Sequence, residues 1–183
     1  MMGIKDWFAK EKKPTLDPLK ELTLATMKVG YFVDFDQKTW EVMAVNWYDF
    51  GQGDRSYEWQ LQGADSTVYL ELEQDDEEYW TLSWKIPFAR LGAKVKEHLV
   101  AEEDPPDQIE FEGIVYYLEE TAGGHYFKDG LSPGKEFLRW SYEDNSGEKY
   151  LEIEQWGEED FEATAGRPVE EYHFTNILPR ETT

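Results

Sequence analysis

The chain has 183 residues, of which 40% are hydrophobic and 16% aromatic, so it carries enough apolar material for a packed core and is not typical of a disordered protein. It contains no cysteine, which excludes disulfides, thiolate nucleophiles and cysteine-bound metal clusters. The formal net charge of −22 would repel nucleic acid and attract a basic protein partner, so we expect no nucleic-acid binding.

Residues 1–27 are expected to form a helical segment followed by a linker. Ile4, Trp7 and Phe8 fall on one face of a short amphipathic helix, with lysines on much of the other face, and the helix should end at Lys13-Pro14. Two interpretations stay open, in which this helix either packs on the rest of the protein or makes weak peripheral contact with a membrane. The three apolar residues are therefore candidate membrane or partner contacts.

The start of the chain lacks the apolar segment of a secretory signal, and no run of about 18 apolar residues occurs anywhere. We therefore expect a cytoplasmic protein, peripheral to the inner membrane if the first helix docks there.

Residues 28–86 show the pattern of a first β unit. Short runs of alternating apolar and polar residues are separated by turn residues, as at Gly51-Gln52-Gly53-Asp54 and Gly63-Ala64-Asp65-Ser66. Five such strands predict a small SH3-like β-barrel or a similar half-closed sheet.

Residues 87–106 are interpreted as a linker. Leu91, Val95 and Leu99 recur every four residues, which favours a helix that ends before Asp104-Pro105-Pro106, although a period of two also fits part of the segment.

The strand pattern then repeats over residues 107–179. Ile109 and Phe111 follow Val33 and Phe35 at an offset of 76 residues, and later residues match at an offset of 81. A hairpin loop near Gly123-Gly124 to Gly134 would absorb the difference. The repeat predicts a mainly β protein of two tandem SH3-like β-barrel units, with shared apolar residues turned inward. The matched pairs at the larger offset are Trp59 with Trp140, Tyr69 with Tyr150, Leu70 with Leu151 and Leu72 with Ile153.

Trp47 and Trp156 have no obvious counterpart in the other copy, so we take them as candidate exposed contact residues.

The acidic run from Glu71 to Glu78 holds six carboxylates, yet it lacks the spacing of a calcium loop. Its simplest interpretation is a solvated strand edge, where charge prevents aggregation.

No motif for catalysis, phosphate binding or metal binding is present. The three histidines, His98, His125 and His173, lack zinc-ligand spacing, and neither a nucleophile elbow nor a glycine-rich phosphate loop occurs. We therefore predict no catalytic residue, no metal and no cofactor.

Several segments resemble the uncharacterised bacterial family called domain of unknown function 4178. They include Val33-Asp34-Phe35-Asp36, Trp40-Glu41-Val42, Glu154-Gln155-Trp156-Gly157 and Phe174-Thr175-Asn176-Ile177-Leu178-Pro179. The resemblance covers nearly the whole chain, and it implies a bacterial cytoplasmic protein with a loose link to membrane-stress response. It implies no activity and no site residue.

Three hypotheses for function follow. The first is a non-enzymatic binding or scaffold protein of the bacterial cytoplasm that acts through protein–protein interaction. The second is an acidic inhibitor, such as an immunity protein or nucleic-acid mimic, that blocks a basic partner. The third is a small-ligand binder with a cavity inside or between the β-barrel units.

Overall fold

A computed structural model describes residues 22–74 and 78–180 of the chain. Eleven antiparallel strands make up most of this part, and helical structure is confined to one α-helix and four short 3-10 helices. The helices are η1 (Leu24–Thr26), η2 (Phe88–Leu91), α1 (Ala93–Glu102), η3 (Lys128–Gly130) and η4 (Glu171–His173). The strands are β1 (Phe32–Phe35), β2 (Lys38–Gly51), β3 (Asp54–Gln62), β4 (Thr67–Gln74), β5 (Glu78–Ile86), β6 (Gln108–Phe111), β7 (Ile114–Phe127), β8 (Lys135–Asp144), β9 (Tyr150–Gly157), β10 (Asp160–Val169) and β11 (Phe174–Leu178).

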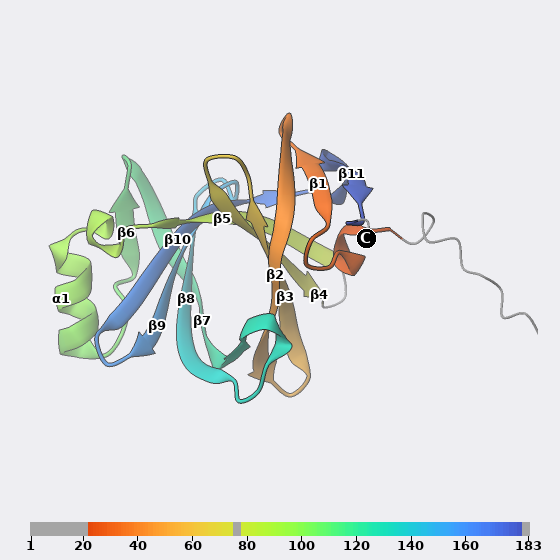
Figure 1. The fold of residues 1–183 in the computed structure, drawn as a ribbon. Coiled ribbons are helices and arrows are strands. Elements are labelled where there is room, and N and C mark those ends of the chain that lie inside the picture. Colours follow the sequence, from red (N-terminus) through yellow and green to blue (C-terminus); the bar gives the residue numbers. More distant parts are fainter. Residues whose placement is uncertain (1–21, 75–77, 181–183) are drawn as a thin grey trace, which may run out of the picture.

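All strands belong to a single sheet (Figure 1). Strands β1 to β5 pair in chain order, and so do β6 to β10. The two series join where β5 pairs with β10, from Ile86 opposite Ala163 to Trp80 opposite Val169. Strand β11 returns to pair with β1 at the other end of the sheet.

A further pairing between β2 and β7 closes part of the sheet. It places Trp47, Tyr48 and Asp49 opposite Phe127, Tyr126 and His125. Because the strand order between these two is β2-β3-β4-β5-β10-β9-β8-β7, their pairing closes eight strands into a ring, which we call the strand ring.

The contact between β2 and β7 depends on close packing. The side chains of Trp47 and Phe127 stack with their centroids 3.9 Å apart. At Gly124 a Cβ atom would overlap the backbone of Asp49, so only glycine permits this approach. The backbone N–H of Asp129 in η3 also donates to Asn46 Oδ1 at 3.0 Å, which holds η3 against β2.

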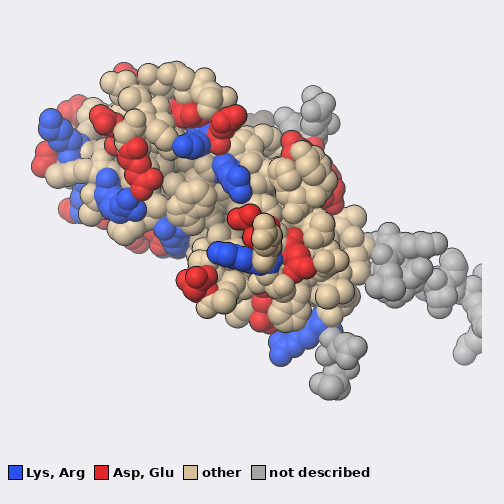
Figure 2. Space-filling model, turned by 90° about the horizontal axis from the view of Figure 1, so that it is seen from above, with Lys and Arg blue, Asp and Glu red and all other residues tan. Residues whose placement is uncertain are grey.

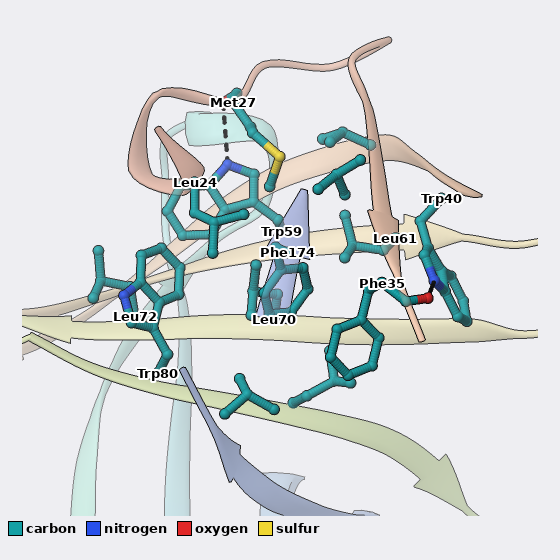
Figure 3. Packing of buried hydrophobic residues seen from close by; sticks show 14 residues of the cluster. Leu24, Met27, Phe35, Trp40, Trp59, Leu61, Leu70, Leu72, Trp80 and Phe174 are labelled. Carbon is teal, nitrogen blue, oxygen red and sulfur yellow. Dashed lines mark hydrogen bonds between the residues drawn. The ribbon is translucent and has the colours of Figure 1, made fainter. Parts of the chain in front are cut away.

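The outer face of the strand ring carries two separate apolar cores. The first lies on β2 to β5 and is covered by η1, β1 and β11. Figure 3 shows Trp59 at its centre, donating from Nε1 to the carbonyl of Met27 at 3.1 Å, and Trp40 donating to the carbonyl of Phe35 at 3.2 Å. Its buried members include Leu24, Val33, Val42, Leu61, Leu70, Leu72, Trp80, Leu82 and Phe174.

The second core lies on β8 to β10 and is covered by β6 and α1, which sits beside this half in Figure 1. Helix α1 forms within the segment expected to be helical, and Val95 and Leu99 face this core. The helix ends at Glu102, and the next residue, Glu103, adopts a left-handed conformation two residues before the first of the two prolines. The other buried members include Ile109, Phe111, Tyr116, Trp140, Tyr142, Leu151, Ile153, Ala163 and Ala165.

The expectation of two SH3-like barrels joined by a linker is not confirmed, although the mainly β class is. The halves share one sheet because β5 pairs with β10 and β2 pairs with β7. The predicted N-terminal helix with Ile4, Trp7 and Phe8 lies outside the described residues. No helix in the described part of the chain is long and apolar enough to cross a membrane.

Candidate ligand-binding site

The inner face of the strand ring is polar, although the same strands are apolar on their outer face. Side chains alternate between the two faces of a strand, so a glutamate between two core residues must point inward. Four glutamates meet there, and we call them the inner carboxyl cluster: Glu58 on β3, Glu71 on β4, and Glu152 and Glu154 on β9. Each is largely buried.

One buried cation, Arg139 on β8, links the cluster across the strand ring. It is only 3% exposed. Its Nη1 lies 2.9 Å from Glu71 Oε1 and 3.7 Å from Glu152 Oε1, and its Nη2 lies 3.0 Å from Glu154 Oε1. The guanidinium also lies 4.2 Å from the centroid of the Tyr48 ring. Arg139 thus connects β4 with β9 through three carboxylates.

The fourth carboxylate, Glu58, is held by neutral donors. Asn46 Nδ2 donates to its Oε1 at 2.7 Å, and the Tyr48 hydroxyl donates to its Oε2 at 3.3 Å. Among the residues that the structure describes, Glu58 makes no ion pair.

Four carboxyl groups therefore face one guanidinium, and burial makes their ionised forms costly. Burial, with the nearby charge of Glu71, raises the pKa of Glu58 to about 7. Burial also raises the pKa of Glu152 to about 8, against the opposing effect of Arg139. The pKa of Glu154 is raised for the same reason. At neutral pH the cluster therefore holds protons that an exposed glutamate would have lost.

A cavity of about 370 Å³ opens onto this cluster, and every strand of the ring contributes to its lining. Toward solvent it is bounded by three half-exposed or exposed lysines, Lys85, Lys128 and Lys135, which we call the outer lysines. Lys85 pairs with Glu162, and the Lys135 ammonium lies 4.7 Å from the centroid of the Trp156 ring. The aromatic walls are Tyr48, Tyr69, Tyr126 and Trp156.

Two buried donors that belong to this lining lack an acceptor. Neither Arg139 Nε nor Trp156 Nε1 has a hydrogen-bond partner in the described part of the protein. An unsatisfied buried donor costs about 1–3 kcal/mol, so an acceptor brought by a ligand would recover free energy.

The structure separates the two tryptophans that the sequence singled out. Trp156 is half-buried and lines the cavity. Trp47 is half-buried on the outer face, stacked between Phe127 and the guanidinium of Arg55 at 4.8 Å. The two residues therefore do not form one contact surface.

Sequence reasoning missed the inner carboxyl cluster. It treated Glu71 as part of a solvated edge, whereas that residue is buried against Arg139 and Ser56. The available signal was the strict alternation of glutamate with leucine or isoleucine in residues 70–73 and 151–154. In residues 22–74 and 78–180, no three histidine or acidic side chains meet in an arrangement suited to a metal ion.

Comparison with known proteins identifies relatives of unknown activity. Residues 28–171 match the family described as "Domain of unknown function (DUF4178)". An uncharacterised protein from Aquifex aeolicus (strain VF5) is 28% identical over 177 residues, which cover 97% of both chains. No solved structure matches.

Proposed function

We propose that this protein, which belongs to the DUF4178 family, is a non-enzymatic binding protein that takes a small polar ligand into the strand ring. One observation supports this most strongly: a cavity of about 370 Å³ opens onto four buried carboxyl groups that share one guanidinium. Cavities of this size with convergent polar groups are typical of small-molecule sites.

The energetic cost of this interior supports the proposal. Replacing a buried ionic cluster by packed apolar residues is often neutral or stabilising, so such a cluster is weak evidence for a role in stability. The two outer cores supply apolar burial on their own. The charged interior is therefore better accounted for by binding.

We further propose that the two five-strand series arose by duplication of one unit. Trp59, Leu70 and Leu72 lie in the first core, and Trp140, Leu151 and Ile153 lie in the second. A duplicated unit would explain why glutamates from both halves converge on the same interior.

We place the protein in the bacterial cytoplasm, and a loose link to membrane-stress response and a basic protein partner stay proposals from the sequence.

The alternative of an acidic inhibitor receives less support. A mimic of nucleic acid needs rows of exposed carboxylates, whereas acidic and basic side chains are interspersed over the face seen in Figure 2. Part of the acidity also lies inside the strand ring, where no partner surface can reach it.

Calorimetric titration against a panel of small polar metabolites tests the proposal. We expect at least one compound to bind, with affinity reduced at least tenfold by Glu154→Gln. The matched control is Glu119→Gln, an exposed glutamate of β7 that should leave affinity unchanged. Failure of every compound to bind, or equal binding by both variants, would contradict the proposal.

A further inference from the structure

The charges along the ring cavity are separated by depth. The inner part has the four carboxyl groups of the cluster against Arg139 alone. The outer part has three lysines against one carboxylate, Glu162. The side chains of Lys85 and Lys135 are 51% and 58% exposed, whereas the inner carboxyl groups are nearly buried. The cavity therefore has a negative inner end and a positive outer end.

Resting on the proposed function, we infer that the ligand is a small zwitterion, bound with its ammonium or guanidinium group at the inner carboxyl cluster and its anionic group at the outer lysines. A ligand with only positive charge would be repelled by the outer lysines, and a ligand with only negative charge would be repelled by the inner carboxylates. Only a ligand with both charges, at opposite ends, offsets the surplus charge at both ends.

Two further contacts favour this orientation. The ring of Tyr48, which lies 4.2 Å from the Arg139 guanidinium at the inner end, is among the cavity walls, and aromatic faces attract organic cations within about 6 Å. Trp156, whose ring lies 4.7 Å from the ammonium of the outer Lys135, carries a buried N–H without an acceptor in the described residues, and the oxygen atoms of an anionic group are strong acceptors. The ligand should therefore carry oxygen acceptors as well as a cationic group.

Binding of the cationic group should also release protons. Glu58 and Glu152 have raised pKa values because of burial, and a cation between them favours their ionised forms. The charged or titratable groups that face them across the strand ring are Glu71, Glu73, Arg139, Glu154 and Tyr48.

Three five-carbon probes that differ only in their end groups test the inference: 5-aminopentanoate, 1,5-diaminopentane and pentanedioate. Calorimetry at pH 7.5 should show the zwitterion binding at least tenfold more tightly than either of the others. Titration in two buffers of different ionisation enthalpy should show proton release on binding.

Variants at each end of the cavity should affect binding in different ways. The double variant Lys128→Gln with Lys135→Gln should raise the affinity for the diamine relative to that for the zwitterion by about tenfold. Glu58→Gln should lower the affinity for the zwitterion by about tenfold. Lys94→Gln, at an exposed position on α1, is the control and should change nothing.

The possible failures are distinguishable. Tighter binding of the diamine or the dicarboxylate would overturn the zwitterion inference but leave the proposed function standing if Glu154→Gln abolished that binding. Absence of binding by all three probes would also overturn the inference. The proposed function would fail only if the wider metabolite panel gave no binding either.

Discussion

At the scale of single residues, the face of the strand that a glutamate occupies decides its chemistry. Glu71 and Glu154 differ from exposed glutamates only in pointing into the strand ring, where Arg139 lies within 3.0 Å of each. In that environment the guanidinium compensates charges that water cannot solvate. Its removal should therefore lower the free energy of unfolding strongly.

We predict that Arg139→Met lowers the free energy of unfolding by about 3–5 kcal/mol at pH 8.5, because it leaves buried carboxylates without a partner. The loss should be smaller at pH 5.5, where these groups can take up protons. Urea unfolding measures both values. The control is Arg90→Met, whose exposed pair with Glu112 should contribute no more than about 1 kcal/mol. A loss below about 1 kcal/mol for Arg139→Met would contradict the prediction.

We also predict that the protein is more stable at pH 5.5 than at pH 8.5, by about 5 kcal/mol. The pKa values of Glu58 and Glu152 are about 7 and 8 in the folded state, above the ordinary value of 4.5. The folded protein therefore holds more protons than the unfolded chain in this range, and stability falls as pH rises through 8.

Urea midpoints at the two pH values measure this difference. Glu152→Gln should reduce the difference by about half, because glutamine stays neutral at both pH values, while the exposed Glu119→Gln should leave it unchanged. A protein that gains stability between pH 5.5 and 8.5 would refute the assignment of buried protonated glutamates.

At the scale of elements, the pairing of β2 with β7 gives the strand ring its closed form. In the described residues the two strands pair through three residue pairs, between 47–49 and 125–127, which we call the seam. The sequence showed the alternation of each strand but not this pairing, because it joins segments about 78 residues apart and depends on Gly124 for close approach. In the sequence this glycine could be interpreted only as part of a hairpin loop.

We predict that Gly124→Ala separates the seam, because the added methyl group would overlap the backbone of Asp49. Overpacking of this kind typically costs about 1–3 kcal/mol. Hydrogen exchange should become faster at the backbone amides of residues 47–49 and 125–127 than in the other strands. Gly157→Ala is the control, since its added Cβ would meet Asp160 at an ordinary 3.6 Å. Unchanged exchange at the seam would contradict the prediction.

At the scale of the whole molecule, the sequence predicted the mainly β class and the apolar residues of both cores, because strict alternation and aromatic residues mark a half-buried strand. It did not predict one shared sheet. Pairing of β5 with β10 uses backbone hydrogen bonds, which carry no signature in side-chain pattern. The polar interior was missed for a related reason, since alternation alone does not distinguish a glutamate facing water from one facing Arg139.

A single sheet predicts a single unfolding transition. Two independent tandem units would unfold separately, whereas the loss of either half here would break the β5–β10 and β2–β7 pairings. We expect urea curves followed by tryptophan fluorescence and by far-ultraviolet circular dichroism to coincide. Two resolved transitions would show that the halves are independent.

The most direct test of the charged interior is a pH titration of the glutamate side-chain carboxyl carbons by ¹³C NMR. If the strand ring buries four carboxyl groups around one guanidinium, the signals of Glu58 and Glu152 should titrate near pH 7 and 8, and they should be lost in Glu58→Gln and Glu152→Gln, respectively. Burial and the nearby Glu71 also raise the pKa of Glu73 to about 7, and its signal should persist in both variants. Titration of every glutamate below about pH 5.5 would mean that the interior is open to water, and the ligand site proposed from it would lose its basis.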